Sequence, residues 1–322
     1  MSRTTHDNAH GTAQSGAGRA GENTMSRLTH DNSGGITRRE FVQGAAAAAA
    51  VVALGPALAG TEAVKKTRVV LVRDAQALDP EGKPRPEVIQ AMLDQGIREL
   101  CGVKQPADGL RALLGNARPV GVKTNGWKYL PTPPEVERAL VKRIAEIGIP
   151  EGSVVVDDRG ARTTLVPCRA LVNARPLRTH HWAGVGGCIK NPIMFAEEPS
   201  FYHPDMCADL ATLWQLPSIK DRIKLNVLVA LTPQFFTKGP HHFDTRYVWR
   251  YNGIFLSTDP VAVDTLGVKL LEAQRRIYFG EDRPLTELAK HVRLAGERHK
   301  LGVSDPSRID FVKVGWDKDL LL

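Results

Sequence analysis

The sequence predicts an α/β domain with a mainly parallel sheet, flanked by helices and interrupted by a long, loop-rich insertion. Three observations indicate this fold. Short apolar runs alternate with amphipathic segments, 42% of the residues are hydrophobic against 24% charged, and glycine and polar residues crowd the stretch 178–243. Alternation of strands and helices is typical of right-handed crossovers between parallel strands. The composition excludes a disordered, collagenous or disulfide-dense chain.

In the first half of the domain, apolar runs predict buried strands and amphipathic periods predict helices. The expected strands are residues 67–72, 119–122 and 153–157. The expected helices are residues 86–100, a short segment at 110–114, and residues 133–147, entered through Thr132-Pro133-Pro134 and ended by Gly148. This order predicts a wound sheet.

The second half is less regular. Strands are expected at 170–172, 224–231, 253–256 and 309–314, with a helix at 285–295. Another helix is expected to begin with Thr258 or Asp259 as its N-cap and Pro260 in its first position. A segment as long and irregular as 178–243 is usually functional in a compact domain.

The N-terminus indicates export. Residues 1–36 are expected to form a disordered extension, in which the segment beginning at Met1 recurs from Met25, so either Met could be the start. Residues 37–59 carry Arg38-Arg39 before a charge-free, alanine-rich run that ends in Ala57-Leu58-Ala59, the pattern of a twin-arginine signal peptide. We therefore expect passage through the twin-arginine translocase to a periplasmic or other extracytoplasmic location. An uncleaved anchor is the alternative, but Gly55 and Pro56 disfavour a stable membrane span. The domain then comprises residues 60–322.

Charge and cysteine content narrow the class of ligand. The chain has 43 Lys+Arg and 35 Asp+Glu, a formal net charge of +8, with no run of five basic residues. This pattern disfavours nucleic-acid binding and favours a small anionic molecule, although a basic surface that only aids solubility would look the same. The four cysteines, Cys101, Cys168, Cys188 and Cys207, form no C-x-x-C pair. We therefore expect neither a four-cysteine zinc site nor an iron–sulfur cluster of its own.

Histidines cluster in the irregular segment, at positions 180, 181, 203, 241 and 242. Neutral imidazoles bind divalent first-row metals and act as acids or bases near neutral pH, so the cluster indicates a site. For any single histidine, an ordinary structural role is the simpler interpretation.

A glycine-rich stretch lies in the same segment, between Arg178 and Asn191. Gly186 and Gly187 let the main chain approach a ligand, and Lys190 and Arg178 add positive charge. The stretch matches neither a phosphate loop nor a dinucleotide fingerprint. It predicts an anion or cofactor site that includes Asn191, with a tight turn as the alternative.

Polar groups at the expected strand ends point to the same region. They are Lys123, Asn125, Asp157, Asp158 and Arg159. Ligands of open α/β sheets bind outside the carboxyl ends of the strands, so these side chains are candidates for the site. Asp259 and Asp264 are weaker candidates, because Asp259 can serve as a helix cap.

These pieces together resemble domain-of-unknown-function family 362 in its twin-arginine-exported form, over nearly the whole domain. The matching motifs are Val120-Gly121-Val122-Lys123-Thr124-Asn125, Thr132-Pro133-Pro134-Glu135-Val136, the block from Arg178 and His180 to Lys190-Asn191, Gly239-Pro240, and Ser257-Thr258-Asp259-Pro260-Val261-Ala262-Val263-Asp264. The resemblance implies an α/β fold but no established activity. Many members of the family carry a ferredoxin module, whose clustered cysteines are missing here.

A more distant resemblance, to the nickel-pincer lactate racemase family, rests on the spacing of His180, Ala183-Gly184, Gly187 and Lys190 and on the downstream His203. It implies that His180 is an acid/base residue and possible metal ligand, Lys190 the amine that links or ligates the cofactor, and His203 a ligand of nickel or another divalent metal. The substrate motif of that family appears here as Lys123-Thr124-Asn125, and its second catalytic histidine has no counterpart. Racemisation needs a group on each face of the carbon, so lactate racemisation itself is not expected.

The sequence therefore predicts an exported protein with a ligand or metal site at His180, Lys190 and His203, bordered by Lys123 and Asn125. The favoured hypothesis is a metal-dependent enzyme that carries out redox or epimerisation chemistry on a small hydroxy acid or related carboxylate. The alternatives are a periplasmic binding protein for a small anion, without turnover, and an accessory factor for redox-enzyme maturation or electron transfer.

Overall fold

A mixed sheet organises the part of the chain that the computed structural model describes, residues 66–236 and 243–322. The strand order is β3-β2-β4-β6-β7-β1-β8, and β5 pairs with β4 off this path. The strands are β1 (Thr67–Arg73), β2 (Val120–Lys123), β3 (Val154–Asp157), β4 (Ala170–His180), β5 (Gly184–Gly186), β6 (Ile223–Gln234), β7 (Gly253–Ser257) and β8 (Ile309–Gly315).

The sheet is mainly parallel, as the sequence predicts. β2 pairs in parallel with both β3 and β4, β4 with β6, and β1 with β8. Strand β7 is antiparallel to both of its neighbours, β6 and β1. The carboxyl ends of β2, β3 and β4 therefore meet at one edge of the sheet.

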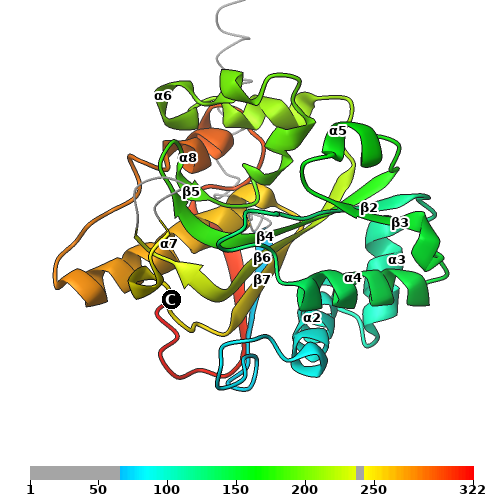
Figure 1. Cartoon of the computed structure of the whole chain (residues 1–322), viewed down its shortest axis with the longest axis horizontal. Coiled ribbons are helices and arrows are strands. Elements are labelled where there is room, and N and C mark those ends of the chain that lie inside the picture. The colour runs from blue at the N-terminus through cyan, green and yellow to red at the C-terminus, as the bar shows by residue number, and fades with distance from the viewer. Residues whose placement is uncertain (1–65, 237–242) are drawn as a thin grey trace, which may run out of the picture. The chain divides into compact units, whose positions relative to one another are not determined.

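Helices cover both faces of the sheet (Figure 1). Helices α2 (Pro86–Cys101), α3 (Pro106–Leu114) and α4 (Pro134–Glu146) pack on one face, and α7 (Pro260–Phe279) and α8 (Lys290–Glu297) lie on the other side. Alternate residues of β1 point to opposite faces, so Val70 and Val72 join the first core and Val69 and Leu71 the second. The molecule is thus a three-layer α/β structure.

Sequence signals at the helix ends agree with the structure. Pro86 and Pro106 occupy the first positions of α2 and α3, where the missing N–H has no helical partner. Asp259 caps α7, since its Oδ1 accepts hydrogen bonds from the backbone N–H groups of Val261 and Ala262. Gly280 ends α7 in the left-handed conformation that glycine favours.

Two predicted elements differ most in their bounds from the structure. The strand expected at 170–172 continues to His180, and every residue of β4 is buried. The polar residues of this continuation bond to other buried polar groups or line a cavity. The helix expected at 285–295 begins later, at Lys290, and residues 286–289 form a turn before it.

Residues 187–222 form the longest irregular stretch of the second half within the described residues. It contains a one-turn helix α6 (Pro204–Cys207) and 3-10 turns at Asn191–Phe195, Pro199–Tyr202 and Leu210–Gln215. A further one-turn helix, α5 (Ala161–Thr164), follows β3. All four cysteines are free thiols, and all except Cys101 are buried.

Several predictions concern residues outside the described part of the chain. They are the extension 1–36, the signal peptide 37–59, the Gly239-Pro240 motif, and His241 and His242. Within the described residues, no helix combines the length and apolarity that crossing a membrane requires.

Candidate functional site

A cavity of about 270 Å³ lies where β2, β3 and β4 end. Asn125 and Trp127 follow β2, Asp158 and Arg159 follow β3, and three side chains come from the last part of β4. Segment 190–203, from the irregular region, completes the wall. The lining residues are Asn125, Trp127, Asp158, Arg159, Arg175, Arg178, His180, Lys190, Asn191, Ile193, Met194, Pro199 and His203.

Most of the side chains singled out from the sequence therefore share one cavity. His180, Lys190 and His203, which are the three central candidates, all line it. Gly186 and Gly187 are not among the lining residues, and neither are Lys123 and Asp157. The Asp157 carboxylate is used locally, where it accepts the Gly160 N–H at 3.1 Å and the Thr164 hydroxyl at 2.6 Å.

Three buried cations dominate the cavity. Arg175, Arg178 and Lys190 are only 3%, 4% and 3% exposed, and none forms an ion pair with a carboxylate anywhere in 66–236 or 243–322. Their remaining contacts are weak or neutral. Arg175 Nη1 donates to Asn191 Oδ1 at 3.4 Å, the Arg178 guanidinium lies 4.1 Å from the centre of the Trp127 ring, and Lys190 Nζ donates to Cys207 Sγ at 3.5 Å.

Burial makes these charges unfavourable in the protein alone. The Nε atoms of Arg175 and Arg178 are buried and have no hydrogen-bond partner among the described residues. Burial, and the proximity of Arg175, hold the pKa of Arg178 well below its usual range. Burial likewise lowers the pKa of Lys190 to about 8, with Arg175 and Arg178 adding to the effect. A buried charge normally needs a partner, and here the protein supplies none.

Lys123 shows what a compensated buried cation looks like. It is 0% exposed, and its Nζ forms an ion pair with Asp158 Oδ1 at 2.5 Å and donates to the Thr124 carbonyl at 2.7 Å. The other Asp158 oxygen accepts the Gly126 N–H at 2.8 Å. The single carboxylate of the cavity is therefore already satisfied and leaves the three cations unpaired.

His180 is neutral and has a defined tautomer. Burial, followed by Lys190, Arg178 and Arg175, lowers its pKa far below the usual range. Its Nδ1 accepts the Trp182 N–H at 3.2 Å, so the ring proton of the neutral side chain resides on Nε2. His180 thus offers the cavity a hydrogen-bond donor.

His203 is also neutral at pH 7. Burial, Lys190 and His181 lower its pKa to about 4, and its ring packs against Trp182 with centroids 4.2 Å apart.

Lys190 is held in place by a rigid turn. The buried Asp264 carboxylate accepts the N–H groups of Cys188 and Ile189 at 2.7 and 2.8 Å. Gly187 makes room for this carboxylate, because a Cβ at that position would collide with it. Asn191 Nδ2 donates to the Lys123 carbonyl at 3.0 Å, which ties the turn to the end of β2. Gly187 thus supports the site from outside the cavity, and Gly186 likewise accommodates the Arg175 guanidinium.

The thiol beside Lys190 comes from a strained turn. Asp205, Met206 and Cys207 have φ values of 50°, 56° and 62°, a left-handed conformation that costs non-glycine residues about 1 to 3 kcal/mol each. Cys207 Sγ also donates to the Trp182 carbonyl at 3.6 Å. Such strain concentrates at functional sites.

The cavity also contains an unused acceptor and an aromatic rim. Asn125 Oδ1 is buried and has no hydrogen-bond partner among the described residues. Trp127, Tyr129 and Phe243 form an aromatic cluster beside it, with ring centroids 5.2 to 6.1 Å apart. A hydroxyl group on a bound molecule would satisfy Asn125 Oδ1.

Reasoning from the sequence missed Arg175, Trp127 and Cys207. The strand was expected to end at 172, so nothing placed Arg175 beside Arg178, and residues three apart on a regular strand would point to opposite faces. The pairing of β4 with β6 shifts register between Pro176 and Arg178, and both arginines reach the cavity at the strand end. The sequence signal that could have identified Arg175 is its position three residues before Arg178, in an Arg-x-x-Arg motif. Nothing in the sequence pairs Cys207 with Lys190.

The nickel-pincer resemblance can be tested against this donor set. Lys190 and His203 face the cavity, as that cofactor would require. His180 does not fit as a metal ligand, because Nε2 carries the proton while Nδ1 accepts the Trp182 N–H. We therefore assign no nickel-dependent reaction to these residues.

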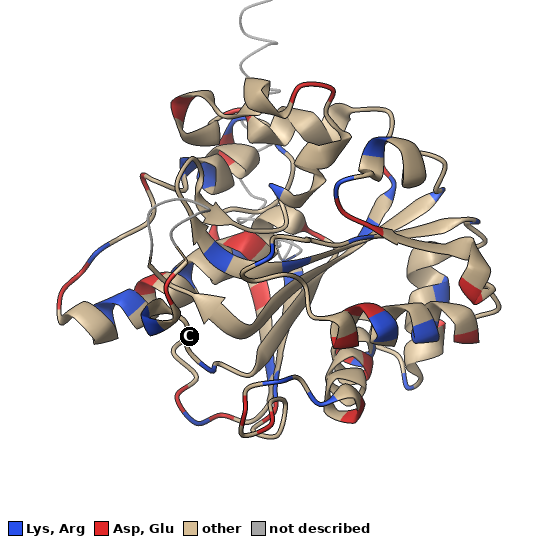
Figure 2. Ribbon diagram, viewed as in Figure 1, with Lys and Arg blue, Asp and Glu red and all other residues tan. Residues whose placement is uncertain are grey.

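Charge is distributed differently over the rest of the fold. Helix α4 carries both acidic and basic residues, whereas β4 carries Arg175 and Arg178 and no acidic residue (Figure 2). Fold and cavity together define an α/β protein with a cationic pocket at the carboxyl ends of parallel strands. Residues 123–269, which include every residue that lines the pocket, match the model of a family described as Domain of unknown function (DUF362). No curated protein and no solved structure matches the chain.

Proposed function

We propose that this protein binds a small carboxylate, with a hydroxy acid as the best match, in the cavity between Arg175, Arg178 and Lys190. The observation that carries the proposal is the burial of these three cations without a carboxylate partner. An anionic ligand would supply the missing counter-charge. This is the small-anion binding hypothesis drawn from the sequence, given a specific pocket.

The chemistry of the donors favours a carboxylate. A guanidinium presents a planar set of N–H groups that matches a carboxylate in a bidentate arrangement. The guanidinium groups of Arg175 and Arg178, which line the cavity, would supply such donors, and their buried Nε atoms have no hydrogen-bond partner among the described residues. The N–H of His180 Nε2 adds a neutral donor beside them.

The remaining polar groups favour a ligand that also carries a hydroxyl group. Asn125 Oδ1 is a buried acceptor, which a bare carboxylate cannot satisfy but a hydroxyl proton can. The cavity of about 270 Å³ lies just below the range of about 300 to 1,000 Å³ typical of larger ligands. A small hydroxy acid is therefore a better match than a nucleotide.

The proposed location is extracytoplasmic, following twin-arginine export. The support is the Arg38-Arg39 pair, the charge-free run after it and the small residues at Ala57-Leu58-Ala59. A protein exported in this way would meet small carboxylates from the surroundings of the cell.

Calorimetry with matched ligands tests the binding proposal. We expect the full chain to bind lactate, to bind propionate more weakly because it lacks the hydroxyl, and not to bind the neutral lactamide. Affinity should fall as the pH rises past about 8, where Lys190 loses its charge. Phosphate and sulfate, measured alongside, distinguish carboxylate selectivity from a general preference for anions. Equal binding of lactate and lactamide, or no binding of any carboxylate, would contradict the proposal.

A further inference from the structure

We propose that Lys190 is an amine nucleophile that forms a reversible imine with the carbonyl group of a 2-oxo acid. This inference rests on the proposed function, because the carboxylate of that acid would be held by Arg175 and Arg178. It adds a covalent role for Lys190 and specifies that the ligand that reacts is a 2-oxo acid and not a 2-hydroxy acid. A 2-oxo acid has the same carbon skeleton as the corresponding 2-hydroxy acid, so one pocket can hold either.

The geometry singles out Lys190 among the buried lysines. Lys123 ends in an ion pair with Asp158 and a hydrogen bond to a carbonyl, so its amine is held as a structural cation. Lys190 Nζ has a single hydrogen-bond partner, the weak acceptor Cys207 Sγ, and it lies in the cavity wall. Its other N–H positions, and its lone pair when it is neutral, are free of competing carboxylates in the described part of the chain.

The neighbouring arginines would place the reacting atom. In a 2-oxo acid the carbonyl carbon is bonded directly to the carboxylate carbon. A carboxylate that bridges Arg175 and Arg178 would therefore bring the carbonyl carbon close to the other side chains of the cavity wall. Among the described residues that line the cavity, Lys190 is the only one with an amine. Holding reactants together in this way accelerates a condensation.

The electrostatics also suit a nucleophile. A lysine becomes reactive when burial or a nearby cation favours its neutral form. Both conditions apply here, and together they lower the pKa of Lys190 to about 8. Part of the Lys190 population is thus neutral near physiological pH, whereas an exposed lysine is almost fully protonated. Burial lowers the pKa of Lys123 to about 8 as well, so the ion pair with Asp158, and not the pKa, separates the two lysines.

The condensation balances without any further reactant. The lone pair of neutral Lys190 Nζ attacks the carbonyl carbon, and the carbonyl oxygen takes a proton to give a carbinolamine. The C–O bond then breaks and a C=N bond forms. Both hydrogens of the amine leave with the carbonyl oxygen as water, and no group is oxidised or reduced. The His180 Nε2–H and the Cys207 thiol are the neighbouring proton donors.

Reductive trapping tests the inference. The full chain is incubated with pyruvate and sodium cyanoborohydride, which reduces an imine to a stable amine, and the modified lysine is located by peptide mass spectrometry. We expect one adduct, on Lys190, with a yield that rises with pH through about 8. Lys190→Arg should abolish the adduct while keeping the positive charge. Lys123→Arg should leave it in place.

The controls separate this inference from the proposed function. Lactate, which has no carbonyl, should bind without giving an adduct and should protect Lys190 from pyruvate. If lactate binds but pyruvate gives no adduct on Lys190, the proposal of imine formation is wrong, whereas the proposal of carboxylate binding is supported. If adducts spread over exposed lysines and lactate does not protect, imine formation is also wrong. If neither acid binds, both proposals fail. Because wild-type protein alone can give each of these outcomes, poor folding of a variant does not affect the test.

Discussion

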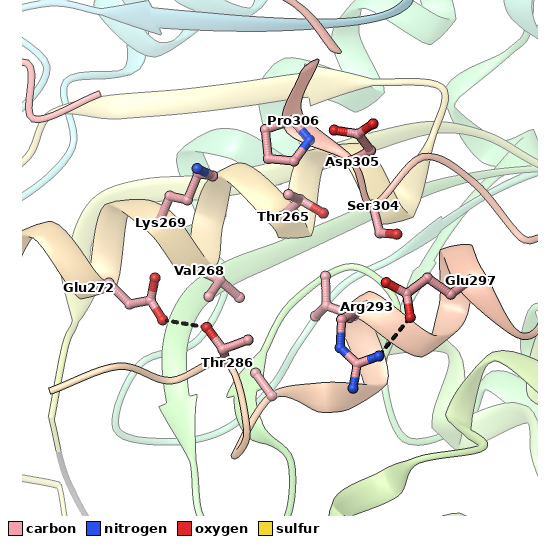
Figure 3. A pocket seen from close by; sticks show the side chains of 12 residues that line it. Thr265, Val268, Lys269, Glu272, Thr286, Arg293, Glu297, Ser304, Asp305 and Pro306 are labelled. Carbon is pink, nitrogen blue, oxygen red and sulfur yellow. Dashed lines mark hydrogen bonds and ion pairs between the residues drawn. The ribbon is translucent and has the colours of Figure 1, made fainter. Parts of the chain in front are cut away.

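Two hollows on this molecule differ in whether the protein itself provides partners for the charged groups that line them. The groove between α7 and α8, at about 440 Å³, is larger than the cationic cavity at about 270 Å³. Its charged groups are largely satisfied by the protein itself. Arg293 pairs with Glu297 at 2.6 Å, and Glu272 Oε1 accepts the Thr286 hydroxyl at 3.1 Å and the Leu285 N–H at 2.7 Å (Figure 3).

The volume of a hollow alone therefore does not identify a ligand site. In the α7–α8 groove an incoming anion would have to displace existing partners and would meet Glu272, Glu297 and Asp305. In the cationic cavity it would complete contacts that the protein leaves open. Substitutions at these two hollows should therefore affect stability and carboxylate binding differently.

Lys123→Met should destabilise the protein most. It removes the partner of Asp158, a carboxylate whose side chain is only 13% exposed, and breaking a buried ion pair from one side typically costs about 3 to 5 kcal/mol. The free energy of unfolding, from denaturant titration, measures the effect. The control is Lys269→Met in the α7–α8 groove, an exposed lysine whose loss should change stability by no more than about 0.5 kcal/mol. Equal losses of stability at the two positions would show that the ion pair with Asp158 does not make Lys123 more important for stability than Lys269.

Arg178→Met should weaken lactate binding about 10- to 100-fold, since a hydrogen bond to a charged group contributes about 1.5 to 3 kcal/mol. Because Arg178 is buried without a counter-charge, its loss should leave the ligand-free protein as stable as before, or more stable. Calorimetry and denaturant titration on the same preparation give both quantities. Loss of stability with unchanged affinity would show instead that Arg178 is structural.

Gly187→Ala should lower the free energy of unfolding by about 1 to 3 kcal/mol, the usual cost of overpacking. The added Cβ would collide with the Asp264 carboxylate that holds the turn before Lys190. Gly152→Ala is the matched control, because a Cβ there meets nothing within 4 Å. We expect only the Gly187 variant to lose lactate affinity as well. Similar stability for the two variants would mean that the turn tolerates displacement of Asp264.

Arg293→Met should have the smallest effect. It removes the exposed i,i+4 pair with Glu297, and such pairs contribute about 0.2 to 0.5 kcal/mol. Lactate affinity should not change, in contrast to the same substitution at Arg178. A drop in affinity equal to that of Arg178→Met would show that carboxylates respond to the overall charge of the protein and not to the cavity.

Much of the secondary structure could be predicted from the sequence, because the signals are local. The apolar run of β1, the proline that begins α2 and the Asp259 cap of α7 each act within a few residues. Position at strand ends also placed Asn125 and Asp158 near each other, since parallel strands bring their carboxyl ends to one edge. The length of β4 was not predicted, because the strand contains buried polar residues such as Asn173, and a pattern of hydrophobic residues does not reveal such a strand. Asn173 donates to Asn226 Oδ1 at 2.8 Å, across to the neighbouring strand.

The class of fold, the excess of positive charge and most segments that build the cavity follow from local patterns in the amino-acid sequence. Which of the buried cations have a carboxylate partner depends on the three-dimensional arrangement of the strands. Asp158 meets Lys123, 35 positions away in the chain, and not Lys190 or either arginine. Spacing along the chain carries no information about that choice, because it depends on how β2, β3 and β4 align and on the register shift that brings Arg175 and Arg178 together.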